Sequence, residues 1–324
     1  MSSQLIITCD TESLVFPASF NSIQRNIFGP RASATGRGAG IEEIMNIADR
    51  VGAKVIFFYD VLTEYSFPGI TQRVADSVLQ RGHLLELHVH IEHLPESWWH
   101  KHGYKKPSWA SNYFDSTTAE LVYGDALRIF KRATGRAPRA FRAGAWRYNN
   151  QILSFLYNNG VGFSFNYYPA TSIRASYPHG PDAGLLKPFR WSNGMIEIHV
   201  STITIPNKFS VNQKYIGFEN HILKTSDSYA NFVNALNDQV PNLKTIVLVM
   251  HSWSLCAFEN NLATEINPDI HDAFVEFMIG MRKDFQIDFS GSDIFDRLLA
   301  YKYEMVVPIE FAGYGNSPLA RYSA

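Results

Sequence analysis

Two histidines stand two positions apart at the end of an apolar run, in the segment 84-LLELHVH-90. If this run is a β-strand, side chains at alternate positions share a face, so His88 and His90 would present two imidazoles side by side. Asp10 and Glu12 follow the first apolar run of the chain and share a face by the same alternation. Two imidazoles and a carboxylate are a common ligand set for a divalent metal, with positions left open for water and substrate.

Two further ionisable residues occur at comparable places. Arg142 lies within 138-PRAFRAGAW-146, and His251 ends the run 244-KTIVLVMH-251. An acid or base beside a metal could move the protons of a hydrolysis. Each residue taken alone has a structural explanation as well, such as a turn cap, an ion pair or a buried hydrogen-bonded histidine. The shared placement at strand ends makes the joint catalytic set the favoured hypothesis.

The strands that would position these residues alternate with helical patterns along the chain. The expected strands are 4–9, 54–59, 84–90, 139–143, 162–168, 195–203, 244–251 and 285–291. Several of them are apolar on both faces, as is typical of parallel strands covered by helices. Seven or eight such units predict an α/β fold, an irregular (β/α)7–8 barrel of parallel strands formed by a single domain over 1–324. Barrel enzymes keep their sites at the carboxyl ends of the strands, where the ionisable residues occur.

Three stretches interrupt the pattern: long loops at 13–40 and 91–116, and a C-terminal tail at about 303–324. Long loops in compact domains usually carry function, and we expect 91–116 to form a lid or wall over the site. Flat aromatic rings suit the apolar faces of sugars, although aromatic residues also anchor loops by packing. The candidate substrate-binding residues are Trp98, Trp99, Trp146 and Tyr148.

The composition is that of an ordinary globular protein, with 46% hydrophobic residues, 18% charged residues and a net charge of -1. Because there is no basic excess, nucleic acid and anionic membranes are not expected partners. Cys9 and Cys256 are too few for a disulfide framework. Neither a secretory signal nor an apolar run of membrane-spanning length is evident, so we expect a cytoplasmic protein without a transmembrane segment. The oligomeric state cannot be predicted.

In these motifs the chain resembles the polysaccharide deacetylases, the NodB-homology domain of carbohydrate esterase family 4. ITCDTE resembles the first motif, with Asp-x-Glu in place of Asp-Asp, and GHLLELHVH the second, with His-x-His in place of His-x-x-x-His. PRAFRAGAW resembles the arginine motif and VLVMHSWS the last, Leu-x-His motif. The resemblance covers most of the chain. It implies a NodB-type barrel and metal-assisted hydrolysis of an N- or O-acyl group on a sugar.

The resemblance also implies a role for each matched residue. Glu12, His88 and His90 would bind one divalent metal ion, with Zn²⁺ expected. Asp10 would be the general base, and His251 the general acid that protonates the leaving amine.

Three positions depart from the family pattern or complete it. Arg142 would orient the base, Asp10, through a charge-assisted hydrogen bond. The position of the family's second histidine is occupied by Glu92, so His93, one residue further on, is an alternative ligand to His90. Asn166 stands near the place where an acidic residue is expected.

The expected function is a metal-dependent hydrolase, a carbohydrate deacetylase that removes an acetyl or formyl group from the nitrogen of a sugar. The substrate would be a precursor in the biosynthesis of a surface polysaccharide. One alternative is a catalytically inactive sugar-binding barrel. Another is an amidohydrolase-like enzyme acting on a non-sugar amide, although amidohydrolases carry their His-x-His pair on the first strand. Iron(II) oxygenases share the ligand types but use antiparallel folds.

Overall fold

The computed structural model describes residues 4–31, 38–107, 116–167, 188–206, 211–215, 245–284, 288–289 and 291–313. Its strands are β1 (Gln4–Thr11), β2 (Val55–Asp60), β3 (Leu84–Val89), β4 (Ala140–Ala143), β5 (Phe163–Ser164), β6 (Phe189–Trp191), β7 (Ile196–Glu197), β8 (Thr202–Pro206), β9 (Val211–Tyr215), β10 (Thr245–His251), β11 (Cys256–Glu259), β12 (Leu262–Ile266), β13 (Asp288–Phe289) and β14 (Val306–Val307).

The helices are α1 (Phe20–Ile23), α2 (Ile41–Arg50), α3 (Ile70–Leu79), α4 (Glu96–Lys101), α5 (Ser116–Thr134), α6 (Asn150–Asn158), α9 (Pro268–Asp284) and α10 (Ile294–Ala300). Short helical turns are η1 (Gln24–Phe28), η2 (Val61–Tyr65), η3 (Ile91–His93), η4 (Gly144–Trp146) and η6 (Ile309–Phe311).

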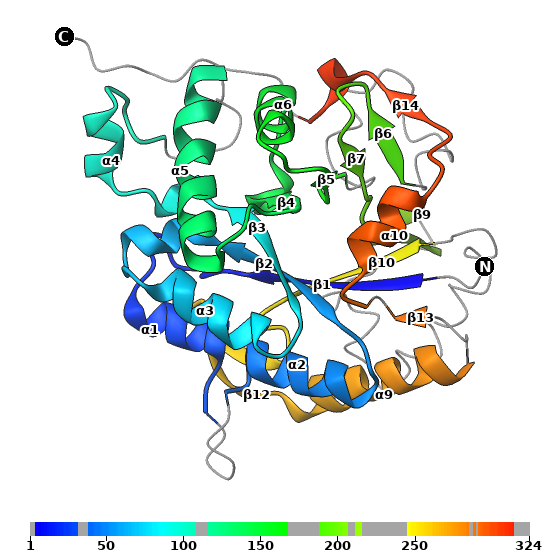
Figure 1. The fold of residues 1–324 in the computed structure, drawn as a ribbon. Helices are drawn as coiled ribbons and strands as arrows, with labels where there is room; N and C mark the ends of the chain where they lie inside the picture. The colour runs from blue at the N-terminus through cyan, green and yellow to red at the C-terminus, as the bar shows by residue number, and fades with distance from the viewer. Residues whose placement is uncertain are drawn as a thin grey trace.

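One large curled sheet forms the centre of the molecule, in the order β10-β1-β2-β3-β4-β5-β7-β6-β14, with β13 also paired to β1 (Figure 1). The pairs from β10 through β4 to β5 and β7 are parallel, and β6 is antiparallel to β7. This confirms the predicted irregular barrel of parallel strands. Over the described residues the path of the sheet is open, running from β10 at one edge to β14 at the other.

Two of the expected strands are much shorter than predicted. The run 162–168 contributes only β5, and the run 195–203 contributes β7 and the first two residues of β8. Beyond Ser164, side chains replace part of the backbone ladder: the Ala143 N–H donates to Asn166 Oδ1 at 2.6 Å. Apolar content predicted the strands correctly, but it could not show where side-chain acceptors take over from backbone carbonyls.

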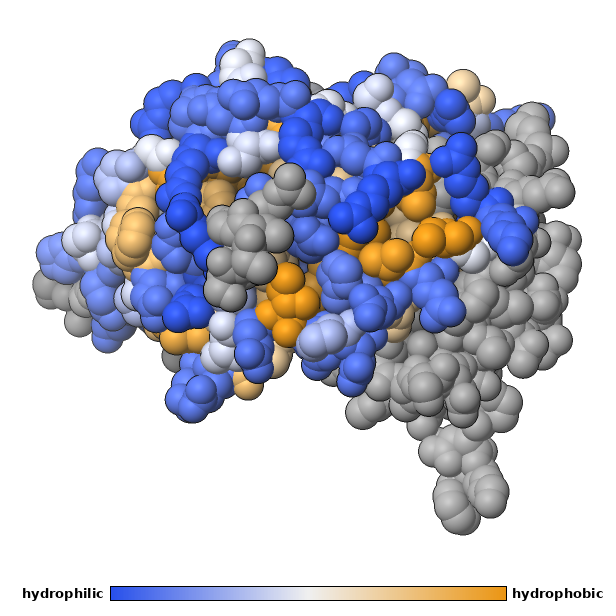
Figure 2. Space-filling view, turned by 90° about the horizontal axis from the view of Figure 1, so that it is seen from below, coloured by the Kyte–Doolittle hydropathy of each residue, from blue (hydrophilic) through white to orange (hydrophobic). Residues whose placement is uncertain are grey.

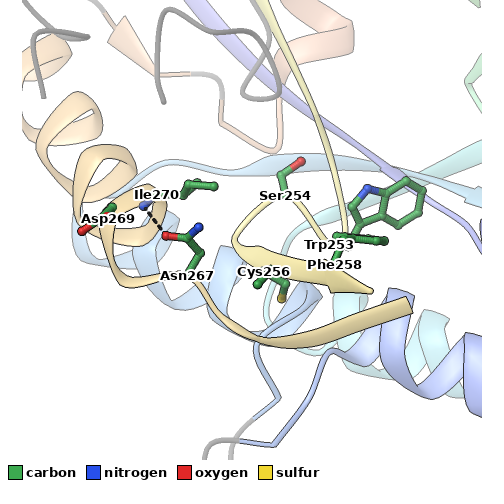
Figure 3. A pocket seen from close by; sticks show the side chains of 8 residues that line it. Trp253, Ser254, Cys256, Phe258, Asn267, Asp269 and Ile270 are labelled. Atoms are coloured by element: carbon green, nitrogen blue, oxygen red, sulfur yellow. Dashed lines mark hydrogen bonds between the residues drawn. The ribbon is translucent and has the colours of Figure 1, made fainter. Parts of the chain in front are cut away.

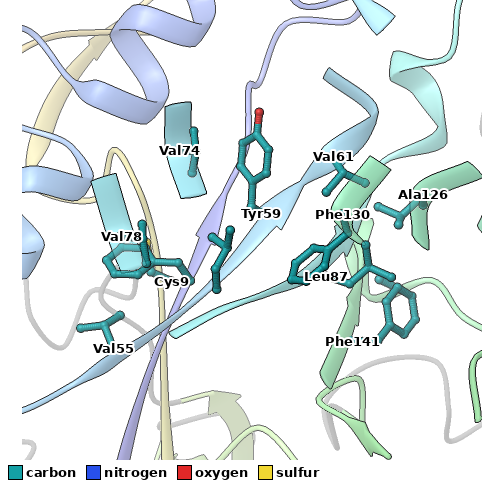
Figure 4. Packing of buried hydrophobic residues seen from close by; sticks show 14 of the residues in the cluster. Cys9, Val55, Tyr59, Val61, Val74, Val78, Leu87, Ala126, Phe130 and Phe141 are labelled. Atoms are coloured by element: carbon teal, nitrogen blue, oxygen red, sulfur yellow. The ribbon is translucent and has the colours of Figure 1, made fainter. Parts of the chain in front are cut away.

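The two faces of the sheet have different neighbours, which the alternation of β1 explains. Leu5, Ile7 and Cys9 point to the outer face and join the larger hydrophobic cluster with α2, α3, α5, α6 and α9 (Figure 4). Ile6 points to the inner face and packs with Ile294, Phe295 and Leu298 of α10. Thr8, Asp10 and Glu12 continue along this inner face, so the strand runs from an apolar core into a polar end.

The predicted loops contain helical structure. Within 13–40 the chain forms α1 and η1, and within 91–116 it forms η3 and α4; residues 32–37 and 108–115 lie outside the described part. Of the predicted tail, β14 and η6 are described, and 314–324 are not. Trp98 and Trp99 of α4 are 6% and 0% exposed and belong to the main core cluster. The first part of 91–116 is therefore packed against the body of the protein, and a lid or wall over the site stays a prediction.

The burial of Trp99 predicts a large effect on stability. Trp99→Ala should lower the free energy of unfolding by about 3–5 kcal/mol, because it leaves a cavity in a close-packed region. Chemical denaturation measures this change, with Lys101→Ala, an exposed position on the same helix, as the control. A change below about 1 kcal/mol would contradict the packing role.

The surface seen in Figure 2 is mainly hydrophilic, with hydrophobic residues in groups between hydrophilic ones. The large hydrophobic side chains that are exposed, such as Ile279, Leu299 and Val306, come from different elements. Among the described helices, none combines the length and the apolar character needed to cross a membrane.

A buried histidine beside β2 makes the fold sensitive to acid. His83 Nδ1 accepts the Val55 N–H at 3.1 Å, and its Nε2 lies 3.3 Å from Asp49 Oδ1. Burial, assisted by nearby Lys54 and Arg81, lowers the pKa of His83 to about 4. A histidine in the unfolded chain has a pKa near 6.5. Between about pH 4 and pH 6.5, His83 is therefore protonated in the unfolded state and neutral in the folded state. Stability should therefore fall as the pH is lowered from about 6.5 towards 4.

We expect the midpoint of thermal unfolding to drop by a few degrees or more between about pH 7 and pH 5. His83→Gln should show a smaller drop than the wild type, since glutamine has no proton to bind. An identical drop in both proteins would mean that His83 does not contribute.

Candidate active site

Five neighbouring strands, β10, β1, β2, β3 and β4, bring the predicted site residues to the carboxyl-terminal end of the sheet. Asp10 of β1 pairs in register with His251 of β10. His88 of β3 pairs with Arg142 of β4 on one side and with Asp60 of β2 on the other. Because these strands are parallel, their carboxyl ends meet at the same level and their inner-face side chains converge.

Three side chains form a compact cluster that could hold a metal ion. One ligand atom each from Glu12, His88 and His90 lie within 4.8 Å of one another, and the cluster is buried or nearly so. His88 Nε2 lies 2.9 Å from Glu12 Oε2, and His90 Nε2 contacts the same oxygen. Two imidazole nitrogens and a carboxylate oxygen are donors that Zn²⁺ and similar ions accept.

The second nitrogen of each ring is held so that Nε2 faces the cluster. His88 Nδ1 lies 2.9 Å from the Arg142 carbonyl, and His90 Nδ1 lies 3.5 Å from Glu92 Oε2. Ligand histidines usually donate their other N–H to a carbonyl or carboxylate, which fixes the tautomer and the ring orientation. The residues present therefore fit a three-coordinate protein site with further positions open.

A glycine makes room for one of these rings. A Cβ added at Gly144 would lie 2.6 Å from His90 Cγ and Nδ1, closer than any side chain tolerates. Ala145 and Trp146, which follow it, have φ values of 50° and 57°, in the left-handed region that favours glycine. Strained residues of this kind persist only where the surrounding structure holds them, and they are frequent at functional sites.

Glu12 and His90 favour each other's charged form. Burial alone would raise the pKa of Glu12, but His90 and His88 hold it well below its usual value. Burial likewise works against protonation of His90, yet the Glu12 carboxylate raises the pKa of His90 well above its usual value. A divalent ion would take the place of the proton between these groups, because ligand histidines bind metal in their neutral form.

Arg142 is fully buried and reaches three acceptors. Its Nη1 donates to Asp10 Oδ1 at 2.6 Å, its Nη2 to Thr8 Oγ1 at 2.9 Å and its Nε to the Phe165 carbonyl at 3.2 Å. The guanidinium also lies 5.0 Å from the Trp146 ring centroid. Charge-assisted hydrogen bonds of this kind hold a carboxylate in one orientation.

His251 approaches the oxygen of Glu12 that His88 and His90 do not contact. Its Nε2 is 3.5 Å from Glu12 Oε1, and its side chain is 21% exposed, so it borders both the cluster and the solvent. Its ring stacks on Trp253 at 4.6 Å between centroids with an interplanar angle of 22°. Trp253 in turn lines a cavity of about 630 Å³ with the β11–β12 hairpin and the start of α9 (Figure 3).

His93 does not join the cluster. Its Nδ1 accepts the Ala18 N–H at 3.2 Å, and its Nε2 lies 3.3 Å from Asp60 Oδ2. Complete burial lowers the pKa of His93 to about 3, so the ring is neutral. The geometry therefore favours His90 over His93 as the second histidine ligand, because the turn η3 directs His93 away.

The predicted aromatic residues lie in different environments. Trp146 contacts the site through Arg142, whereas Trp98 Nε1 donates to Asp125 Oδ2 at 2.8 Å. Trp99 and Tyr148 are 0% exposed, so a sugar-binding role for them or for Trp98 does not fit their burial. Spacing along the chain cannot distinguish an aromatic residue at a rim from one in a core.

Two residues that sequence reasoning missed also belong to the site. Asp60 is fully buried and accepts the His90 N–H at 3.2 Å; as an acid at the end of an apolar strand, it carried the same signal as Asp10. Burial raises the pKa of Asp60 to about 7. Phe16 is 43% exposed and lies 5.4 Å from His90 between ring centroids. No pattern in the sequence marks Phe16.

The comparisons with known proteins rest on structure. No protein-family model matches the chain, and no curated protein matches it in sequence. A structure from Mycobacterium smegmatis, classed provisionally as a polysaccharide deacetylase, is 15% identical, with a TM-score of 0.57 over 94% of each chain. The 4-alpha-glucanotransferase of Thermococcus litoralis is 11% identical with a TM-score of 0.55, covering 97% of this chain and 43% of its own.

These two neighbours carry different enzyme names, so the shared architecture does not by itself fix a reaction. What the likeness shows is the fold. The chain has the NodB-type barrel fold of the polysaccharide deacetylases, as its motifs predicted.

Proposed function

We propose that this protein is a metal-dependent hydrolase that removes an acyl group, acetyl or formyl, from the nitrogen of a sugar. One observation carries the proposal. At the carboxyl ends of the strands, the Glu12–His88–His90 cluster lies beside two residues that can exchange protons, Asp10 and His251. A barrel that only binds sugar would need neither a general base nor a general acid.

The cluster residues would hold one divalent ion. When bound, such an ion lowers the pKa of a water molecule and polarises the acyl oxygen of the substrate. Asp10 would then accept the proton of the attacking water, with its carboxylate oriented by Arg142. His251 would donate a proton to the leaving nitrogen, and its partial exposure places it where a substrate can reach it. Stacking on Trp253 fixes the plane of its ring.

Aromatic side chains around the site support a sugar substrate. The exposed Phe16 ring lies beside His90, and Trp146 lies beside Arg142. Trp253, which stacks on His251, also lines a cavity together with Phe258. The deacetylase class given to the Mycobacterium smegmatis neighbour agrees with an acylated sugar, which we propose to be a precursor of a surface polysaccharide.

A substrate panel tests the proposal. Metal-loaded protein is incubated with N-acetylated sugars, N-formylated sugars and an acylated amine that is not a sugar, and the free acid is measured. We expect acid from a sugar and none from the simple amide. Release from the simple amide alone would favour the amidohydrolase-like alternative, and tight sugar binding without release would favour the binding barrel.

A further inference from the structure

A second buried carboxylate lies behind the arginine of the site. Glu197 of β7 is 0% exposed, and its Oε1 accepts the backbone N–H groups of Asn166 and Tyr167, both at 2.7 Å. Its Oε2 accepts the Trp191 Nε1–H at 2.9 Å. A fully buried carboxylate needs such donors, because an unpaired charge inside a protein is very costly.

The segment that Glu197 holds is the one that contacts Arg142. Between Ser164 and Tyr167 the chain presents the Phe165 carbonyl to Arg142 Nε at 3.2 Å. The side chain of Asn166 ties the same segment to β4, since its Oδ1 accepts the Ala143 N–H at 2.6 Å. Its Nδ2 donates to Ser164 Oγ at 2.9 Å.

The contacts therefore form a continuous chain from Glu197 to the carboxylate of Asp10. Glu197 fixes the backbone of Asn166, this segment fixes the Phe165 carbonyl, and that carbonyl anchors one edge of the guanidinium. Another edge of the guanidinium holds Asp10. Every residue in the chain of contacts is at most 4% exposed, so water cannot readily replace a lost acceptor.

We propose that Glu197 and Asn166 are positioning residues that act through the 164–167 segment on Arg142, and through Arg142 on Asp10. The catalytic consequence rests on the proposed function, whereas the effect on Arg142 does not. Since a misplacement of about 1 Å can cost about a hundredfold in rate, a small shift of the Phe165 carbonyl should be measurable.

A second buried glutamate, Glu86 of β3, offers a matched control. Glu86 is also 0% exposed, and its Oε2 accepts the backbone N–H groups of Arg139 and Ala140 at 2.6 and 3.0 Å. It also accepts from Arg136 Nη2. Glu86 thus holds the backbone at the start of β4, just as Glu197 holds the backbone of the 164–167 segment. Among the described residues, Glu86 has no hydrogen bond with Asp10, Thr8 or Phe165, the acceptors of Arg142.

The first measurement is independent of activity. The exchange rate of the Arg142 Nε–H proton is followed by ¹⁵N–¹H NMR on the full chain, with the signal assigned by its loss in Arg142→Lys. Glu197→Gln keeps an oxygen for two backbone donors but turns an amide N–H towards Trp191. We expect exchange to accelerate on the order of tenfold in Glu197→Gln and in Asn166→Ala, and to remain near wild type in Glu86→Gln.

The second measurement is kinetic. In both positioning variants kcat for acyl release should fall on the order of tenfold with KM and bound metal unchanged. Adding Trp191→Phe to Glu197→Gln removes the opposing donor and should restore both kcat and slow exchange. Unchanged exchange in Glu197→Gln and Asn166→Ala, or equal acceleration in Glu86→Gln, overturns the inference. If exchange responds but the wild type releases no acid, the proposed function fails and the positioning role stands.

Discussion

Asp10→Asn should lower kcat for acyl release by about a hundredfold or more, as removal of a general base usually does. The amide keeps the shape of the carboxylate and can still accept the hydrogen bond from Arg142 at one oxygen, but it cannot take a proton. Because Asp10 lies outside the Glu12–His88–His90 cluster, bound metal and the unfolding midpoint should stay close to those of the wild type.

The matched control is Asp76→Asn on α3, where the aspartate contacts only the exposed Gln72 side chain in the described structure. This variant should keep full activity. An Asp10→Asn protein that turns over substrate at the wild-type rate would remove Asp10 from the mechanism. A variant that loses its metal would instead place Asp10 among the ligands.

His88→Ala should abolish stoichiometric metal binding and, with it, acyl release. The imidazole contributes one of only two nitrogen donors, and its position is fixed from behind by the Arg142 carbonyl. Loss of a ligand from a three-residue site leaves too few donors to hold a divalent ion tightly. Elemental analysis of purified protein should give about one zinc per chain for wild type and a small fraction of that for the variant.

Two further histidines make the result specific. His102→Ala, in the α4 region, should keep the metal, because its Nδ1 contacts only the Trp98 carbonyl. His93→Ala should keep the metal as well, although it removes the side chain that contacts Asp60 Oδ2 and should lower stability. If His93→Ala lost the metal and His90→Ala kept it, the ligand assignment would be wrong.

The site was largely predictable because it depends on short-range rules. Alternation along one strand puts Asp10 and Glu12 on the inner face, and the same rule pairs His88 with His90. The register that sets Asp10 opposite His251 follows once the strands are parallel and adjacent. These relations need no knowledge of side-chain packing, which is why the cluster could be proposed from spacing.

What the sequence could not predict depends on contacts between distant segments. Nothing near Glu197 in the sequence indicates that its carboxylate holds the backbone of Asn166 and Tyr167. Similarly, the burial of Trp98 and Trp99 depends on how α4 packs into the core, which composition alone does not reveal. Aromatic residues in a long loop suggested a lid or wall over the site, but spacing could not show that Trp98 and Trp99 are part of the core.

The central claim is that a metal held by Glu12, His88 and His90 makes this protein a sugar deacylase. The most direct measurement is acid release from an N-acylated sugar by one preparation in three states: as purified, stripped with a chelator, and reloaded with zinc. The account predicts release in the first and third states and none in the second, with the stripped protein still folded. Equal release in all three states, or no release in any while the sugar binds equally well to wild type and Asp10→Asn, would contradict it.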